Sequence, residues 1–159
     1  EKYTNFILSL EWKISEVGNS GIFWGVYEDE KFSEAYMTGP EIQVLDNEKH
    51  PDSFVGNGIH KAGSLYDLIG YPAEHINPAG EWNTSAIKFM YRNGKYYVEH
   101  RLNGKKILGF VPWSEDWYKR KNDSKWKDAE KYGAFKKGYI GLQDHDSQLW
   151  FRNIKIRKL

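Results

Sequence analysis

The sequence predicts an all-β protein, an antiparallel sandwich or barrel with a single helical insert. About eight short segments have the alternating or continuously apolar pattern of strands. Turn residues, including two Asn-Gly pairs, separate these segments. Aromatic residues make up 16% of the 159 residues, and they favour strands because each buries a large apolar area. No repeat or linker divides the chain, so we expect one domain over residues 1–159.

The first part of the chain predicts three strands. Residues 6–14 alternate between apolar and polar, which indicates a strand with one buried face. The Gly-Asn-Ser-Gly sequence at 18–21 predicts a turn. Residues 22–27 are apolar apart from one glycine, so this strand is either buried on both faces or carries an aromatic ligand surface. After a polar loop, Pro40 opens a short strand over 41–45.

The middle of the chain predicts four more strands. One covers residues 64–69, between two loops that are rich in turn residues. The other three form a meander over residues 82–91, 96–102 and 106–111. Each Asn-Gly pair between them supplies the positive φ angles that a tight hairpin turn requires.

The last part of the chain holds the only helix candidate. Residues 114–132 begin with Ser114 as a suitable N-cap and are followed by Gly133. The Asn-Asp-Ser sequence at 122–124 is compatible with one helix or with two short ones. Residues 138–144 and 148–156 predict a final hairpin that turns at His145-Asp146-Ser147.

The charge balance and the missing motifs exclude several classes of function. The chain carries 23 Lys and Arg against 22 Asp and Glu, a net charge of +1, whereas a nucleic-acid binder carries a clustered basic excess. No apolar run approaches the roughly 18 residues that span a bilayer. The chain has no cysteine, and its five histidines lack the spacing of a local zinc site. Phosphate loops, nucleophile elbows and His-Glu-x-x-His motifs are also absent.

Glu41 and Gln43 form the first candidate site. In the strand over 41–45, Ile42 and Val44 share one face, which we expect to enter the core. Glu41 and Gln43 then project from the outer face about 7 Å apart, and Asp46 follows at the strand end. A carboxylate beside an amide can bind a polyol or serve acid–base chemistry. A solvated strand face explains the same pattern.

Gln143-Asp144-His145-Asp146 forms the second candidate site. A carboxylate next to a histidine orients the ring and raises its pKa, as a general base requires. A turn held by Asp side chains that bond to the local backbone explains the same residues.

Aromatic side chains beside loops are further candidates for carbohydrate binding. Tyr66 and Trp82 stand near predicted strand starts, where binding groups gather. Sugar C–H groups pack on aromatic faces, while sugar hydroxyls pair with amides, carboxylates and guanidinium groups. Residues 113–127 interleave basic and aromatic residues, but acidic neighbours offset the charge. We therefore expect this segment to be a lid or a helix that covers a sheet edge.

A set of short motifs covers nearly the whole chain in a fixed order: Asn19-Ser20-Gly21-Ile22-Phe23, Glu41-Ile42-Gln43-Val44-Leu45-Asp46, Gly63-Ser64-Leu65-Tyr66-Asp67-Leu68, Gly80-Glu81-Trp82-Asn83, Leu102-Asn103-Gly104, Gly141-Leu142-Gln143-Asp144-His145 and Phe151-Arg152-Asn153-Ile154. In these motifs the chain resembles a bacterial domain family labelled 3-keto-disaccharide hydrolase. The resemblance implies a concanavalin-like jelly-roll sandwich, related in shape to laminarinase-type glycoside hydrolases. It also implies export to the periplasm or the cell exterior. Family members usually carry a Phe-Asp-Gly stretch and a Trp before the first strand, and we expect this chain to lack that segment.

The resemblance implies a reaction as well. A ketone at C3 of a glucoside acidifies the hydrogen at C2, so a base can remove it, the group at C1 is eliminated and water adds. On this basis we expect Glu41 or His145 to be the catalytic base. We expect the substrate to contact Gln43, Asp46, Tyr66, Trp82, Gln143 and Arg152. The step needs no nicotinamide, so no cofactor is expected, and the sequence does not define a metal.

Two other functions remain open at this point. One is conventional glycoside hydrolysis by two carboxylates, with Asp46 or Glu81 beside Glu41, which requires a separation of about 5–9 Å. The other is a non-catalytic, lectin-like module, because the same fold and aromatic residues also serve binding alone. In each case the expected partner is a carbohydrate.

Overall fold

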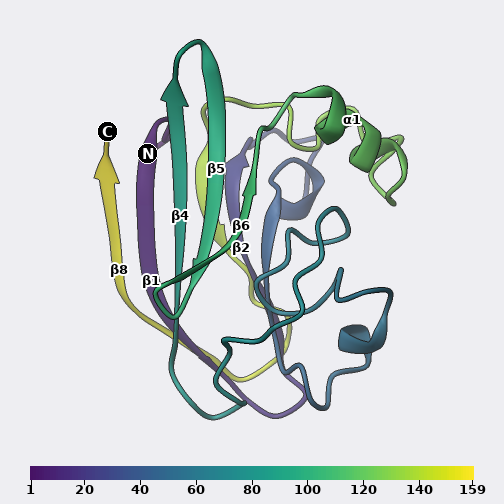
Figure 1. Ribbon diagram of the computed structural model, residues 1–159, viewed down its shortest axis with the longest axis vertical. Coiled ribbons are helices and arrows are strands. Elements are labelled where there is room, and N and C mark those ends of the chain that lie inside the picture. Colours follow the sequence, from purple (N-terminus) through teal and green to yellow (C-terminus); the bar gives the residue numbers. More distant parts are fainter.

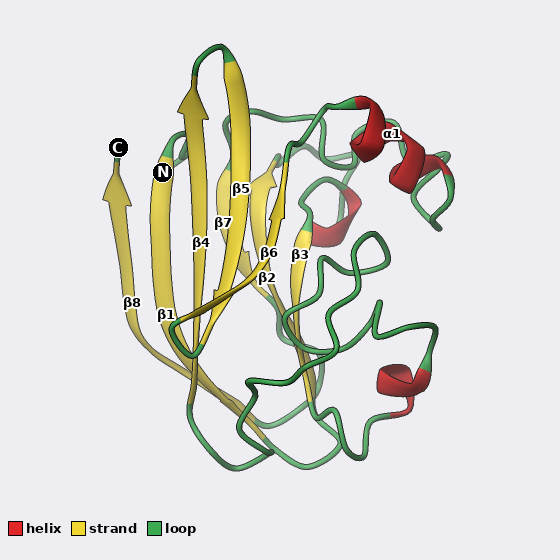
Figure 2. Cartoon of the chain, in the orientation of Figure 1, coloured by secondary structure: helices red, strands yellow, loops and turns green.

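Two antiparallel sheets pack face to face in the computed structural model, which describes residues 1–159 (Figure 1). The larger sheet has the order β6-β5-β4-β1-β8 and the smaller one the order β3-β2-β7. Their strands are β1 (Phe6–Ile14), β2 (Asn19–Val26), β3 (Glu41–Leu45), β4 (Asn83–Arg92), β5 (Lys95–Leu102), β6 (Lys105–Phe110), β7 (Tyr139–Leu142) and β8 (Leu149–Lys158). Helical structure is limited to α1 (Glu115–Asn122) and the 3-10 turns η1 (Ala35–Met37) and η2 (Pro51–Phe54) (Figure 2). The predicted all-β sandwich with a short helical insert is confirmed.

The core lies between the two sheets and follows the alternation of the strands. In β1 every second residue, from Phe6 to Ile14, is at most 2% exposed. Trp24 of β2 packs against Phe89 of β4 with ring centroids 5.3 Å apart, which joins the two sheets. Full burial of one such side chain contributes about 1.5–3 kcal/mol. The period-two pattern therefore fixes which face of each sheet is turned inward.

The predicted meander is confirmed by the turns between β4, β5 and β6. Asn93 and Gly94 have φ angles of 49° and 78°, and Asn103 and Gly104 have 46° and 79°. Asn and Gly tolerate this left-handed region better than other residues, so two-residue turns form at both sites.

The predicted turn at 18–21 is wrong, because most of it belongs to β2. Asn19, Ser20 and Gly21 pair with β3 in register, and Gly21 lies opposite Gln43. The chain turns earlier, where Gly18 N–H donates to Ser15 C=O at 3.0 Å. Ser20 is fully buried, and its hydroxyl donates to Gln143 C=O at 2.7 Å, so this polar residue is satisfied inside the protein.

The predicted strand at 64–69 is also wrong. The segment folds back on itself, since the N–H groups of Leu68 and Ile69 both donate to Leu65 C=O at 2.9 Å. Its backbone nevertheless covers the free edge of β3, where Tyr66 N–H donates to Glu41 C=O at 3.0 Å. Tyr66 is thereby placed beside Glu41.

The helix is shorter than the sequence predicts. It begins after Ser114, whose hydroxyl accepts from Trp117 N–H at 3.2 Å, and ends at Asn122. Beyond it, Ser124 bonds to the backbone of Lys121 and Trp126, which competes with helical hydrogen bonding. Residues 123–132 therefore form turns, and a second helix is absent. No helix is both long and apolar enough to cross a membrane.

The final two strands do not form the predicted hairpin. β7 pairs with β2 in the smaller sheet, whereas β8 pairs with β1 in the larger one. The connection after β7 therefore crosses from one sheet to the other. Gln143, at the start of this connection, is bonded to β2. Its N–H donates to Gly21 C=O at 2.9 Å, and its C=O accepts from the Ser20 hydroxyl at 2.7 Å.

Candidate functional site

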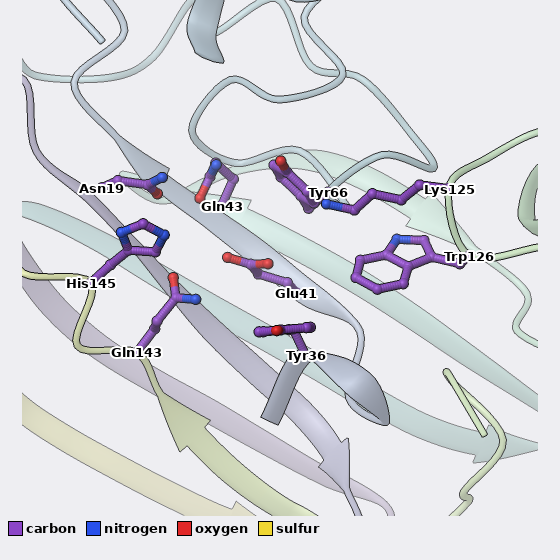
Figure 3. Close-up of a pocket in the computed structure, with 9 residues that line it drawn as sticks. All are labelled: Asn19, Tyr36, Glu41, Gln43, Tyr66, Lys125, Trp126, Gln143 and His145. Carbon is purple, nitrogen blue, oxygen red and sulfur yellow. The ribbon is translucent and has the colours of Figure 1, made fainter. Parts of the chain in front are cut away.

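A pocket of about 480 Å³ opens on the outer face of the smaller sheet. This volume lies within the range of small-molecule binding sites. Figure 3 shows its lining residues pointing toward a common space: Asn19, Tyr36, Glu41, Gln43, Tyr66, Lys125, Trp126, Gln143 and His145. Five of the side chains predicted from the sequence are among them, namely Glu41, Gln43, Tyr66, Gln143 and His145.

Glu41 lies at the floor of the pocket. It is on the predicted outer face of β3, but the surrounding loops leave it only 6% exposed. No protein group donates a hydrogen bond to its carboxylate. Burial in this environment raises the pKa of Glu41 to about 8, against the lowering effect of the nearby Lys125. Glu41 can therefore both release and accept a proton near neutral pH.

Gly21 leaves the space that the Glu41 carboxylate occupies. A methyl group built on Gly21 would overlap this carboxylate, and Gly21 itself lies on the neighbouring strand β2. The φ angle of Gly21 is in the range that any residue adopts. Glycine is therefore required here because of the Glu41 side chain on the neighbouring strand, and not because of the backbone conformation.

Amide and imidazole groups surround Glu41 on one side. Gln43 is 1% exposed, and its Oε1 accepts from Val44 N–H at 3.1 Å, which leaves its NH₂ group for a ligand. Asn19, Gln143 and His145 lie at the same end of the pocket (Figure 3). The crossing loop is tied to β2 there, because Asn19 N–H donates to the Ser147 hydroxyl at 3.1 Å. These groups suit the hydroxyls of a sugar.

The other end of the pocket is aromatic and carries one cation. Trp126 stacks on Tyr132 with ring centroids 4.3 Å apart, and the ring centroids of Tyr36 and Trp126 are 6.3 Å apart. Lys125 Nζ is 4.1 Å from the centroid of the Tyr66 ring and 4.6 Å from that of Trp126. Partial burial lowers the pKa of Lys125. This end can pack a sugar ring or another flat group and place a positive charge beside it.

Three residues predicted to contact substrate lie outside the pocket. The Asp46 carboxylate accepts from the N–H groups of Val17 and Glu48 at 2.8 and 3.1 Å, so it holds the loops at the end of β3. Trp82 and Arg152 lie together on the larger sheet, with the guanidinium carbon 3.7 Å from the Trp82 centroid. These three residues therefore contact loops and strands outside the pocket.

Four pocket residues were not among the predicted site residues. Lys125 and Trp126 belong to the segment of interleaved basic and aromatic residues that was expected to be a lid or a helix covering a sheet edge. The sequence pattern was therefore noticed, but no contact with substrate was predicted for it. Asn19 was hidden in an apparent turn. Tyr36 comes from η1 within a polar loop, and nothing in the sequence distinguishes it from other exposed tyrosines.

The chemistry of the pocket centres on a single carboxylate. Glu41 is the only acidic residue in its lining. No group of three or more His, Asp or Glu side chains in the structure is arranged to hold a metal ion. One largely buried carboxyl group with amide donors and an ammonium in the same pocket can move a proton and stabilise a developing oxyanion.

Comparisons with known proteins identify relatives of this chain. The chain is 35% identical to a protein named 3-keto-disaccharide hydrolase from Bacteroides thetaiotaomicron, over 99% of this chain and 60% of that protein. The chain thus spans about three fifths of the length of this curated relative.

Solved structures show the same fold. A Parabacteroides distasonis protein described as a candidate glycosyl hydrolase matches with a TM-score of 0.88 and 38% identity, over 100% of this chain and 74% of that one. A second protein from the same organism, described likewise, matches with a TM-score of 0.72 and 28% identity, over 100% of this chain and 80% of that one. Residues 1–157 match the family described as 3-keto-alpha-glucoside-1,2-lyase-like domain. The chain therefore belongs to the 3-keto-alpha-glucoside-1,2-lyase-like domain family.

Proposed function

We propose that the protein is an enzyme that cleaves 3-keto-glucosides by proton abstraction at C2, elimination at C1 and addition of water. The observation that carries this proposal is Glu41, a buried carboxyl group with a pKa of about 8 on the floor of a sugar-sized pocket. The 1,2-lyase in the family description agrees with an elimination between C1 and C2. The name of the Bacteroides relative agrees with net hydrolysis of a 3-keto-disaccharide.

Glu41 acts as the base in this reaction. Its ionised carboxylate takes the hydrogen from C2, and the electron pair moves to the C3 oxygen to give an enolate. A carboxylate whose pKa is near the ambient pH is a stronger base than an ordinary one, because it holds the transferred proton more tightly. A general base contributes about 10²–10⁴-fold to the rate.

The neighbouring groups stabilise charge and supply a proton. The Lys125 ammonium and the Gln43 amide line the same pocket as Glu41 and are donors that suit the enolate oxygen. When the enolate collapses, the C1–O bond breaks and the departing oxygen takes a proton, which we assign to His145. Water then adds its hydroxyl to C1 and a hydrogen to C2, so the net reaction is hydrolysis.

Conventional two-carboxylate hydrolysis has less support. The pocket lining contains no second carboxylate beside Glu41. Asp46, one of the partners considered, is bonded to two backbone N–H groups elsewhere, and Glu81, the other, lies outside the pocket.

A deuterium-labelling experiment tests the proposal. The protein is incubated with a 3-keto-disaccharide in ²H₂O, with the unoxidised disaccharide and an enzyme-free sample as controls. We expect release of free sugar from the ketone only, with deuterium at C2 of the product above the enzyme-free level. Release without deuterium would indicate direct hydrolysis, and binding of the sugar without release would indicate a lectin-like module. Either result would contradict the proposal.

A further inference from the structure

His60 lies behind the pocket wall, between two carboxylates. Its Nδ1 is 2.8 Å from Asp52 Oδ1 and its Nε2 is 2.8 Å from Asp67 Oδ1. A carboxylate oxygen accepts hydrogen bonds, so each ring nitrogen must donate for both contacts to be favourable. His60 is only 8% exposed, which makes an incomplete pairing of these charges costly. With both ring nitrogens donating, His60 bridges the two carboxylates.

The free oxygen of each carboxylate holds a segment of the pocket wall. Asp52 Oδ2 accepts from the Tyr66 hydroxyl at 3.1 Å, and Asp67 Oδ2 accepts from Lys125 N–H at 2.8 Å. The His60 ring also stacks on the Tyr66 ring, with centroids 4.3 Å apart and an angle of 19°. Glu41 is held in place by the sheet, whereas Tyr66 lies in a loop. The contacts with His60 and Asp52 therefore hold Tyr66 in place.

The direction of the Tyr66 hydrogen bond decides what this side chain offers to a ligand. Burial and the neighbouring Asp52 raise the pKa of Tyr66 above its usual value, so the hydroxyl keeps its hydrogen. That hydrogen is donated to Asp52 Oδ2, so it is not available to a ligand. Tyr66 consequently presents oxygen lone pairs to the pocket, and these accept a hydrogen bond from a hydroxyl group.

We propose that His60, through Asp52, is a positioning residue that fixes Tyr66 as a hydrogen-bond acceptor for a hydroxyl of the sugar. This inference rests on the proposed function, because it names how the same pocket recognises its substrate. Without the His60 ring nitrogen, Asp52 loses the hydrogen-bond partner that holds its carboxylate toward Tyr66. The Tyr66 hydroxyl then rotates freely and loses its preference for a donor.

A double-mutant cycle on KM and kcat tests the inference. His60→Phe keeps the stacked ring but removes both N–H donors, and Tyr66→Phe removes the hydroxyl that the network orients. We expect His60→Phe alone to raise KM for the 3-keto-disaccharide about tenfold with little change in kcat, the size of one lost hydrogen bond. In the Tyr66→Phe background the same substitution should change KM less than about twofold. An equal loss in both backgrounds, or no loss in either, would overturn the inference.

Two further proteins keep the test interpretable. His50→Asn is the matched control, because His50 lies in the same loop and its Nδ1 only accepts from Asp52 N–H at 3.1 Å, a role that Asn can retain. It should leave KM unchanged, and a tenfold rise there would count against a specific role for His60. If His60→Phe does not fold, Asp52→Asn enters the same cycle, since His60 and Tyr66 donate to different oxygens of Asp52 and Asn replaces one of these oxygens with an NH₂ group, which cannot accept.

The test can fail separately from the proposed function. If the wild-type protein shows no turnover, the same cycle is measured as the Kd for 3-ketoglucose by calorimetry. A Kd that rises with His60→Phe only when Tyr66 is present supports the inference even then. A Kd that responds equally in both backgrounds overturns it.

Discussion

Two glutamates on outward strand faces, Glu41 on β3 and Glu11 on β1, have opposite environments. Glu11 lies on the larger sheet, where Asn153 Nδ2 and Arg152 Nε donate to its two oxygens at 2.8 and 2.7 Å. These bonds, Asn153 first, lower the pKa of Glu11. Glu41 lies on the smaller sheet, receives no hydrogen bond from the protein and is buried, so its pKa is raised.

The difference between the two residues comes from what covers each sheet. Loops and turns bring Tyr36, Tyr66 and Trp126 over β3 and leave Glu41 only 6% exposed. The outer face of β1 has no such cover, and neighbouring strands satisfy Glu11 directly. The pKa of Glu41 is raised because the carboxyl group is buried and unpaired, not because it stands on an outward strand face.

The largest expected effect separates the two glutamates by activity. Glu41→Gln removes the base with almost no change in shape, so kcat/KM for a 3-keto-disaccharide should fall by about 10²–10⁴-fold. Glu11→Gln should leave kcat/KM within about twofold, because Glu11 is remote from the pocket. Steady-state kinetics of both variants checks this. Similar losses in the two variants would remove the distinction between the sites.

The next effect concerns the space around Glu41. Gly21→Ala should displace the carboxylate and lower kcat/KM on the order of 100-fold, the cost of a misplaced catalytic group. Stability should change little, because the overlap is with the end of a flexible side chain. Gly109→Ala on β6 is the matched control, since its methyl group would meet only the end of Lys106 at 3.0 Å. Full activity in Gly21→Ala would show that the position of Glu41 is not restricted in this way.

The burial of Glu41 also affects stability as a function of pH. Because the pKa of Glu41 is raised from 4.5 to about 8, the folded state keeps a proton that the unfolded state releases between these values. The wild-type protein should therefore lose stability relative to Glu41→Gln as pH rises through this window, by about 4 kcal/mol between pH 5 and pH 9. Urea unfolding of both proteins at pH 5 and pH 9 measures the difference. A difference that is independent of pH would contradict the burial of an ionisable Glu41.

The smallest effect is expected on the larger sheet. Arg152→Ala removes an exposed ion pair with Glu11 and a contact with Trp82, so the free energy of unfolding should fall by about 1 kcal/mol or less. kcat/KM should not change. A large loss of activity in Arg152→Ala would restore the role that the sequence first suggested for it.

Local sequence patterns were sufficient to predict most of the strands and the side chains that those strands place on one face. The alternation of β1 and the Asn-Gly turns follow from backbone geometry within a few residues, and alternation in β3 put Glu41 and Gln43 on one face. That face was expected to be outward, and the sequence did not reveal that loops would bury it.

Features that depend on contacts between segments far apart in the sequence could not be predicted from local patterns. The segment at 64–69 resembles a strand but folds back against β3, and β7 and β8 resemble a hairpin but join different sheets. Trp82 and Arg152 were assigned to the substrate because they are aromatic and planar-charged, the same properties that make them pair with each other. Tyr36 and Lys125 enter the pocket only through the tertiary arrangement of loops.

The most direct test of the account is the titration of Glu41 itself. In protein with ¹³C-labelled glutamate carboxyl groups, the Glu41 signal is identified by its loss in Glu41→Gln and followed from pH 3 to pH 10. The account predicts a midpoint near 8 for Glu41, while Glu11 titrates below the usual range. A Glu41 midpoint near the ordinary value of 4.5 would mean that the carboxyl group is hydrated or paired, and would contradict its role as the buried base.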